Sequence, residues 1–302
     1  MTLKHGISRL VPLALTTVAA LLLAACGGGG SSDAATTSAP GTISGNVVKG
    51  PVSGAAVKAY AVSGGALGTQ VSSATTDAQG AFTMSMGNYA GPVMLQMSGG
   101  TYTDEATGAL MTMGTGDTMT AVLPTVAAGS AVTGVEVTPL TAMAQAMAAR
   151  MAGGLTDANI AAANSAVGNY FMVGDILHTQ PMNPLVAGSA TGASQAMMNY
   201  GMTLAAMSQY AKSTGMTASS GFVTAMMNDA ADGVIDGKAA GIPVTMGGGM
   251  MGGSMMQTDA GRTGLATAMT DFMNSSLNKS GVSSTSMATL MQQLRTSGGQ
   301  MR

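Results

Sequence analysis

The chain has 302 residues and a formal net charge of −2, with 8% charged and 46% hydrophobic residues. Typical domains are about 25% charged, and the few lysines and arginines here form no basic cluster, which excludes a nucleic-acid-binding surface. The high hydrophobic content predicts a folded rather than a disordered chain. The two unusual features of the composition are its 44 glycines and 30 methionines.

The first 25 residues are predicted to be a secretory signal peptide. Lys4 and Arg9 give a positive start, and a mostly apolar run follows over residues 10–25, which is the order found in such signals. The run is shorter than the ~20 apolar residues that span a bilayer. Because no later stretch reaches that length, we expect no transmembrane helix.

The leader ends in Leu23-Ala24-Ala25-Cys26, which resembles the lipobox of bacterial lipoproteins. The resemblance implies cleavage before Cys26 and acyl chains (palmitate among them) on it, so that the membrane is a partner through this anchor. Gly27 in the next position is similar to the sorting pattern of outer-membrane lipoproteins of Gram-negative bacteria. The alternative is an ordinary secretory signal with a free thiol beside its cleavage site.

Residues 26–40 have the composition of a flexible tether. They are rich in glycine, serine, threonine and alanine, as are linkers without fixed structure. Cys26 is the only cysteine, so no internal disulfide can form even in an oxidising compartment.

Residues 41–138 are predicted to form a small antiparallel β-sandwich with a β-rich extension. Short alternating strands separated by Gly, Pro and Asp turns are typical of sandwiches. Asp77 should accept turn N–H bonds, and Gly80 should take a positive φ before Phe82 enters the core. The expected strands are 42–48, 56–62, 70–76, 81–86, 92–97, 118–123 and 131–137.

Two segments of this region, VKGPVSGAAVKAY (48–60) and TTDAQGAFTM (75–84), resemble the carboxypeptidase regulatory-like domain, a transthyretin-like sandwich. The resemblance covers residues 41–100 and implies a non-catalytic module that aids folding, spacing or binding. YTDEATG (102–108), with VTPLT (137–141) after it, is similar to an architecture that recurs among uncharacterised proteobacterial lipoproteins and implies no activity.

Asp104 and Glu105 form an adjacent carboxylate pair, which invites an acid–base or calcium-binding interpretation. On a strand the two side chains would point to opposite faces of the sheet, and in a loop water would surround them. We therefore expect a solvated pair without a chemical role.

Residues 139–302 are predicted to form a Met- and Ala-rich, all-α irregular bundle, so that the whole chain is an α+β protein with two separately folding domains. Thr138 suits an N-cap and Pro139 the first helical position. The expected helices are 139–151, 156–170, 194–212, 219–231, 259–277 and 283–294. Most helical methionines should fill the core, because their side chains adapt to irregular gaps.

The Gly-rich stretch 246–256 is predicted to be a loop with no face in the core. Thioethers are soft ligands that suit Cu(I), so copper handling is the alternative function and Cu(I) the only cofactor considered. The candidate ligands are Met246, Met250, Met251, Met255 and Met256. A low-complexity insertion without metal, or methionines that consume oxidants, would explain the loop equally.

Two further groups are considered, one as a metal site and one as a catalytic site. Asp229, Asp232 and Asp236 miss the spacing of a calcium loop and favour a helix-terminating turn. His178 is the one histidine outside the leader, and no Gly-x-Ser-x-Gly motif accompanies it, so a catalytic triad is not favoured. We expect a non-enzymatic envelope lipoprotein whose partner is a protein or an envelope polymer.

Overall fold

The computed structural model describes residues 39–247 and 253–302. The predicted signal peptide, Cys26, and most of the tether lie outside the described residues, as do Met250 and Met251. The described chain is a mixed α and β protein in which nine strands are followed by six α-helices, with four further two-residue strands between the fourth and fifth helices. No helix within 39–247 and 253–302 is long and apolar enough to span a bilayer.

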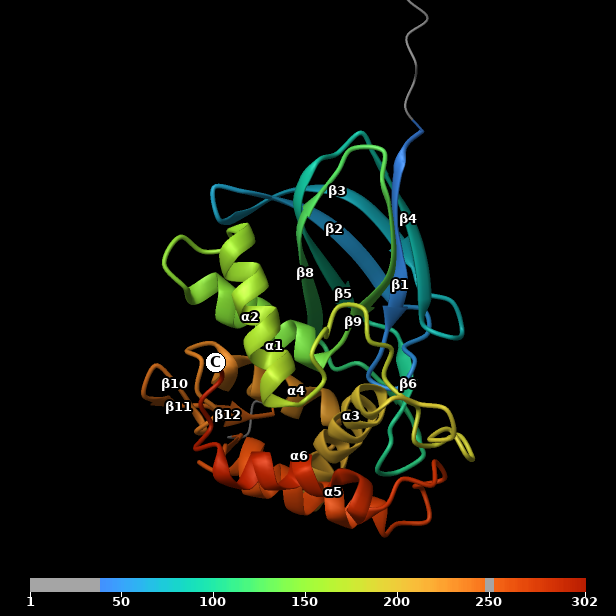
Figure 1. The fold of residues 1–302 in the computed structure, drawn as a ribbon, viewed down its shortest axis with the longest axis vertical. Coiled ribbons are helices and arrows are strands. Elements are labelled where there is room, and N and C mark those ends of the chain that lie inside the picture. The colour runs from blue at the N-terminus through green and yellow to red at the C-terminus, as the bar shows by residue number, and fades with distance from the viewer. Residues whose placement is uncertain (1–38, 248–252) are drawn as a thin grey trace, which may run out of the picture. The chain divides into compact units, whose positions relative to one another are not determined.

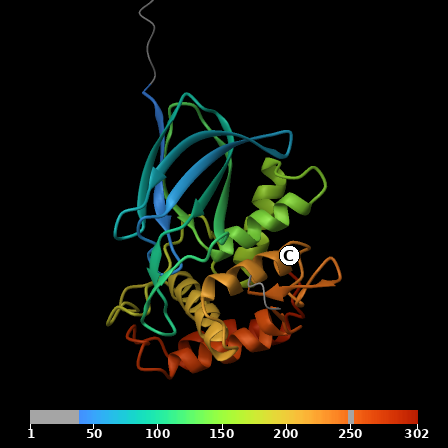
Figure 2. The same cartoon turned by 180° about the vertical axis from the view of Figure 1, so that it is seen from behind.

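The strands build two principal sheets (Figures 1 and 2). The three-stranded sheet has the order β4-β1-β9, formed by Ala81–Gly87, Gly41–Val47 and Ala131–Val137. The four-stranded sheet has the order β3-β2-β5-β8, formed by Ala66–Thr75, Ala56–Ser63, Gly91–Ser98 and Thr118–Val126. A short pair, β6 (Thr101–Thr103) and β7 (Leu110–Thr112), stands apart. All the predicted strands are present, within a few residues at their ends.

One strand pair departs from the predicted antiparallel arrangement. β1 and β4 are antiparallel, but β1 and β9 are parallel. β9 crosses from the edge of the four-stranded sheet to the other sheet through the turn at 127–130. The direction of β9 is therefore set by this connection from β8 and not by a hairpin with β1, its partner in the three-stranded sheet.

The turn between β3 and β4 forms as the sequence predicts. Oδ1 of Asp77 accepts the backbone N–H groups of Gln79 and Ala81, each at 2.9 Å. Gly80 has φ +79°, and a Cβ there would lie 2.7 Å from the carbonyl oxygen of Val47. Glycine is thus required both by the backbone conformation and by the close approach of β1.

Strands β5 and β8 of the four-stranded sheet are buried on both faces. Val93 and Leu95 of β5 contribute to a cluster shared with the three-stranded sheet, whereas Met94 contributes to the cluster of the helices. Met94 pairs with Val122 of β8, which faces the helices as well. A strand that is covered on both faces has apolar residues at successive positions. This accounts for the run Val93-Met94-Leu95 in β5.

The helices follow from Pro139 and largely keep the predicted bounds. They are α1 (Pro139–Arg150), α2 (Asp157–Tyr170), α3 (Gln195–Ser213), α4 (Ser219–Ala230), α5 (Leu265–Met273) and α6 (Ser284–Thr296). Thr138 caps α1 by accepting the N–H of Thr141, and Pro139 takes the first position as expected. The change from strands to helices falls where the sequence predicts it.

The predicted helix 259–277 is wrong in its first turn and its end. Residues Ala260–Gly264 form a π-helical turn in which Arg262 has φ −121° and ψ −106°. A Cβ on Gly261 would lie 2.3 Å from Cγ2 of Ile235, and one on Gly264 would lie 2.8 Å from the Tyr210 ring. These close approaches fix the chain locally and override the helical pattern of the sequence.

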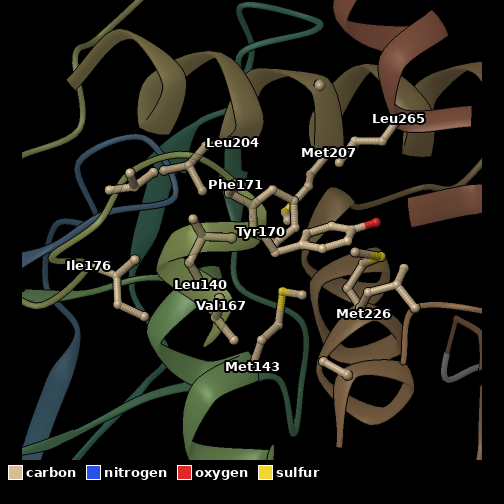
Figure 3. Packing of buried hydrophobic residues seen from close by; sticks show 14 of the residues in the cluster. Leu140, Met143, Val167, Tyr170, Phe171, Ile176, Leu204, Met207, Met226 and Leu265 are labelled. Atoms are coloured by element: carbon tan, nitrogen blue, oxygen red, sulfur yellow. The ribbon is translucent and has the colours of Figure 1, made fainter. Parts of the chain in front are cut away.

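Methionines fill the core of the helical part, as predicted. Met143 of α1, Met207 of α3, Met226 of α4 and Met269 of α5 are 0% exposed. Figure 3 shows Met143, Met207 and Met226 converging with Tyr170 and neighbouring aliphatic side chains. Unbranched thioether side chains suit this junction because the helices meet at irregular angles.

Candidate functional site

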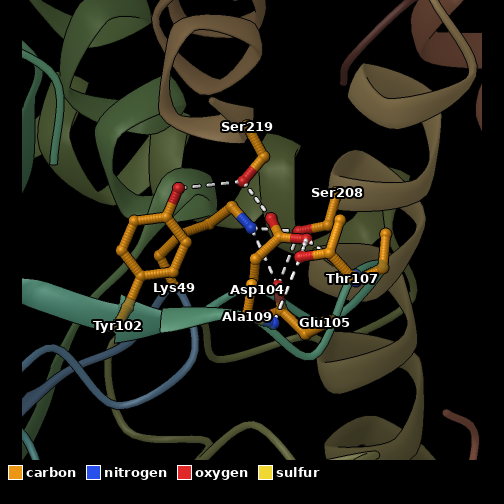
Figure 4. A network of polar contacts seen from close by, with 9 residues as sticks. Lys49, Tyr102, Asp104, Glu105, Thr107, Ala109, Ser208 and Ser219 are labelled. Atoms are coloured by element: carbon orange, nitrogen blue, oxygen red, sulfur yellow. Dashed lines mark hydrogen bonds and ion pairs between the residues drawn. The ribbon is translucent and has the colours of Figure 1, made fainter. Parts of the chain in front are cut away.

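A buried polar cluster connects the strands with helices α3 and α4 (Figure 4). We call it the Lys49 cluster; its members are Lys49, Tyr102, Asp104, Glu105, Ser208 and Ser219, each at most 4% exposed. Lys49 lies in the turn after β1, Tyr102 in β6, and the two carboxylates directly after β6. Ser208 belongs to α3, and Ser219 begins α4.

The turn at 48–51 brings Lys49 into the cluster. Val48 and Pro51 form an isolated β-bridge across it, and Gly50 has φ +62°. A Cβ on Gly50 would lie 2.5 Å from the carbonyl oxygen of Thr103. Only glycine allows the turn to pack this closely on β6, and the packing places Lys49 beside the residues that follow β6.

Lys49 is held as an ammonium ion. Its Nζ donates to Oε2 of Glu105 at 2.9 Å and also contacts the hydroxyl of Ser208. Nζ lies 5.4 Å from the centre of the Tyr102 ring, within the range of a cation–π contact. Burial alone lowers the pKa of Lys49, but the negative charges of Glu105 and Asp104 outweigh burial and raise it above its ordinary value.

Asp104 is held as a carboxylate by a separate set of donors. Its Oδ1 accepts the N–H groups of Ala106 and Thr107 and the Thr107 hydroxyl, at 3.1, 3.0 and 3.0 Å. Its Oδ2 accepts the hydroxyl of Ser219 at 2.6 Å, and that hydroxyl lies 3.0 Å from the Tyr102 hydroxyl. Burial raises the pKa of Asp104, but the charge of Lys49 and these hydrogen bonds lower it below its ordinary value.

The expectation of a solvated Asp104–Glu105 pair is wrong, because the two residues are 3% and 2% exposed. A buried charge needs a partner charge or several hydrogen bonds. Here Lys49 and the hydroxyls of α3 and α4 supply both, from 56 to 115 residues away along the chain. The one local signal was Lys49 itself, a lysine between two valine-containing strands in a chain with few charges.

The contacts of Ser208 differ from those of a serine–lysine catalytic pair. Ser208 contacts Lys49, which superficially matches a serine–lysine pair in which a neutral amine removes the hydroxyl proton. Ser208 instead donates to Oε2 of Glu105 at 2.6 Å, and the raised pKa of Lys49 keeps its amine protonated. The amine of Lys49 is therefore not a base for Ser208.

Two small cavities flank the cluster. One of about 90 Å³ has Glu105 in its wall, together with Asn46, Gln180 and Asn183. The other, of about 200 Å³, is bordered by Asp104 and the exposed Lys212. Lys212 donates to the carbonyl oxygen of Ala106 at 2.8 Å, so its charge is partly engaged by the turn that carries the carboxylates.

The predicted loop 246–256 has a face in the core, contrary to the expectation. Met246 ends β12 (Thr245–Met246), which pairs with β13 (Ser254–Met255). Met246 and Met256 are 6% and 4% exposed and belong to the helical core, whereas Met255 is 59% exposed. Two of the five candidate thioethers are thus occupied by packing, and Cu(I) binding stays a prediction.

Asp229 and His178, the remaining candidates, make local contacts only. Oδ1 of Asp229 accepts the N–H groups of residues 236, 237 and 238, which confirms a helix-terminating turn. Nδ1 of His178 lies 2.9 Å from Oδ2 of Asp175, and both side chains are exposed. Within the described part of the chain, no three His, Cys, Asp or Glu side chains come together as a metal site would require.

The comparisons with known proteins do not identify a family. The sequence matches no protein-family model, and no curated protein matches it. Solved structures with a detectable likeness include a 9R-lipoxygenase from Cyanothece PCC8801, which is 10% identical, with a TM-score of 0.22. The likeness covers 37% of this chain and 18% of the lipoxygenase chain, and a TM-score this low carries no inference.

Proposed function

We propose that this chain is a lipid-anchored module of the cell envelope that acts in binding or envelope structure and not in catalysis. The anchor would be Cys26 in the outer membrane of a Gram-negative bacterium. The order of Lys4 and Arg9, the apolar run 10–25 and Leu23-Ala24-Ala25-Cys26 supports this assignment. A lipid-bearing N-terminus followed by a Gly/Ser-rich stretch would hold the folded unit at the membrane surface.

The proposal includes a transthyretin-like β-sandwich of the carboxypeptidase regulatory-like kind, followed by an irregular helical bundle. The cluster of buried side chains shared by the two sheets supports the sandwich. So do the turns at Gly50-Pro51 and Asp77–Gly80, which carry the resemblance in the sequence and form tight turns in the structure. Modules of this kind suit spacing and binding.

The observation that carries the non-catalytic assignment is that the charged groups of the Lys49 cluster already have hydrogen-bond partners within the protein. Its amine is protonated, both carboxylates accept several hydrogen bonds, and the hydroxyls of Ser208 and Ser219 donate to carboxylates. Catalytic acids and bases need pKa values close to the working pH. The raised pKa of Lys49 and the lowered pKa of Asp104 move both groups away from neutrality.

Two measurements test the proposal. Fractionation of cells that express the Cys26→Ala variant should show loss of acylation and loss of membrane retention, with Ser31→Ala in the neighbouring stretch as the control. Treatment of the full chain with a serine-reactive fluorophosphonate should leave Ser208 unlabelled. Normal acylation of Cys26→Ala would refute the anchor, and labelling that disappears in Ser208→Ala would refute the non-catalytic assignment.

A further inference from the structure

The cavity of about 90 Å³ beside the Lys49 cluster, here called the Glu105 cavity, lies where three parts of the fold meet. Its walls come from the end of β1 and the turn after it, from the loop at 180–184, and from Gly201 and Leu204 of α3. Gln79 and Gln180 are exposed and border its open side. One water molecule needs roughly 10–15 Å³ of such space, so the cavity has room for a small ligand group.

Glu105 presents one unpaired carboxylate oxygen to this cavity. Its Oε2 accepts both of its donors, Lys49 at 2.9 Å and Ser208 at 2.6 Å. Its Oε1 accepts no hydrogen bond from residues 39–247 or 253–302, and it is not among the fully enclosed unpartnered atoms, which belong to Glu136, Asp229 and Arg262. Glu105 is 2% exposed, so this small exposed part faces the cavity that the residue lines. A carboxylate oxygen in such surroundings favours any donor that can reach it.

The buried charges beside the cavity do not balance. Lys49 contributes one positive charge, whereas Asp104 and Glu105 contribute two negative charges. Among the described residues that line the cavity, Glu105 alone is charged. Because a buried charge is stabilised by an opposite charge, a cationic donor fits this cavity better than a neutral one.

The walls favour a cation that carries an apolar stem. Six lining residues are apolar: Val48, Pro51, Pro181, Met182, Pro184 and Leu204. The three prolines have no backbone N–H to donate, and Asn46 spends its amide N–H on Glu136 at 3.1 Å. An ammonium has three donors and no acceptor, and a methylene chain behind it packs on apolar surface. Calcium is a poorer match, because it takes about six to eight oxygen ligands and Glu105 is the one carboxylate in these walls.

The second cavity beside the Lys49 cluster is a weaker candidate for binding a cation. It is bordered by Asp104 and Lys212. Both oxygens of Asp104 already accept hydrogen bonds, from Thr107 and Ser219 among others. The ammonium of Lys212 also places a positive charge in its wall, which repels a second cation.

We propose that the Glu105 cavity binds a primary alkylammonium group, which is the chemistry of a lysine side chain and of a free aliphatic amine. The ammonium would donate to Oε1 of Glu105, and its methylene groups would lie against the apolar lining. This inference gives the proposed binding role a ligand class. It does not rest on the lipid anchor, because every residue of the site lies between positions 46 and 204.

Methionine-methyl NMR of the full chain in detergent, titrated with n-butylammonium chloride, tests the proposal at the site itself. The signal of Met182, which lines the cavity, is identified by its loss in Met182→Leu. We expect it to shift saturably with a Kd between about 10 μM and about 1 mM, a range open to a ligand of so few atoms. 1-Butanol, which has the same stem without the charge, should bind about tenfold more weakly or less.

Two further probes distinguish the source of the ammonium. Nα-acetyl-lysine methylamide presents the side chain as a protein does, and the corresponding norleucine compound is its neutral control. Binding of the lysine compound as tight as that of n-butylammonium supports a lysine of a protein or peptide. Binding of n-butylammonium alone supports a free amine, because the cavity would then exclude the peptide backbone.

Gln180→Lys tests the charge of the site without removing Glu105. Gln180 is exposed at the opening, so a lysine there leaves the packing intact and places a competing ammonium within reach of the cavity. Binding of n-butylammonium should weaken by about tenfold or more, whereas Gln180→Met, which is neutral and of similar length, should keep it. No saturable shift of Met182 up to about 10 mM, as for a cavity that holds water only, would overturn the proposal. Equal binding of 1-butanol, or equal effects of the two Gln180 variants, would overturn it as well.

Discussion

Nζ of Lys49 lies 2.9 Å from Oε2 of Glu105, and the two side chains are 0% and 3% exposed. The pair joins the turn after β1 to the turn after β6, and Ser208 extends it to α3. A buried ion pair adds little net stability over well-packed apolar residues, but removing one partner leaves an uncompensated charge. The geometry therefore predicts a marked asymmetry between single and double substitutions.

Lys49→Met should lower the free energy of unfolding by about 3–5 kcal/mol, the usual effect of stranding a buried charge. Glu105 would lose its cation, and Asp104 would lose the charge that lowers its pKa. Urea unfolding at neutral pH, followed by circular dichroism, measures the change. Lys58→Met, at an exposed lysine of β2, is the control and should change stability by about 0.5 kcal/mol or less.

The double variant Lys49→Met/Glu105→Met should be more stable than Lys49→Met alone, because it removes the stranded charge of Glu105 together with its partner. Both variants keep Asp104 and its bond from Ser219. Equal stability of Lys49→Met and wild type would contradict the role assigned to the ion pair.

The pH dependence of stability should reveal another buried carboxyl, Glu136 in β9. Burial raises its pKa from 4.5 to about 7, although a hydrogen bond from Asn46 lowers it in part. Between these two values the folded chain holds a proton that the unfolded chain has released. The free energy of unfolding therefore falls as the pH rises from about 4.5 to about 7, by an amount on the order of 3 kcal/mol.

Glu136→Gln should flatten that slope, because an amide does not titrate. Asp229, with a pKa raised from 3.8 to about 6 chiefly by burial, would leave a smaller slope of the same sign in the variant. Asp271→Asn, at an exposed position of α5, should keep the wild-type profile. Urea unfolding at a series of pH values decides the matter, and an unchanged slope in Glu136→Gln would exclude this assignment.

Local patterns were sufficient to predict most elements of the fold, but not the short strands β6, β7, β12 and β13. Thr138-Pro139 marked the start of α1, and Asp77 and Gly80 marked the turn before β4. These features depend on capping, turn geometry and side-chain period, which are properties of a few neighbouring residues. The π-helical turn at Ala260–Gly264 was missed because it depends on contacts of Gly261 and Gly264 with distant residues.

The candidate site could not be predicted in the same way. Asp104 and Glu105 were noticed as a pair, but their burial depends on Lys49, Ser208 and Ser219, which only the fold brings near them. Residue spacing does not indicate which distant hydroxyl will donate a hydrogen bond to a buried carboxylate. The same limit applies to Met246 and Met256, whose place in the core follows from how β12 and β13 pack on the helices.

The buried contacts between strands and helices argue against the sequence-based expectation of two separately folding domains. Residues 39–138 expressed alone should fail to unfold cooperatively. The fragment would lose the hydroxyls that bind Asp104 and Glu105 and would expose Met94 and Val122, which face the helices. Circular dichroism during urea unfolding of the fragment, beside residues 39–302, measures this. A cooperative β-sheet transition in the fragment would instead support two separately folding domains.

Cu(I) binding, if it occurs, should depend on the candidate methionines other than Met246 and Met256, whose thioethers pack in the core. Replacing Met250, Met251 and Met255 by leucine should abolish it, whereas Met172→Leu, at a methionine that is 37% exposed away from this stretch, should not. Thioethers do not protonate as imidazoles do, so affinity should persist at low pH. Met246 and Met256 are kept because they are 6% and 4% exposed, and substitutions there would disturb packing.

Titration with Cu(I) in the presence of a competing chelator measures this binding. We expect no stoichiometric site. Sub-micromolar binding that the triple variant loses, on the order of −8 kcal/mol or stronger, would make copper handling the better assignment.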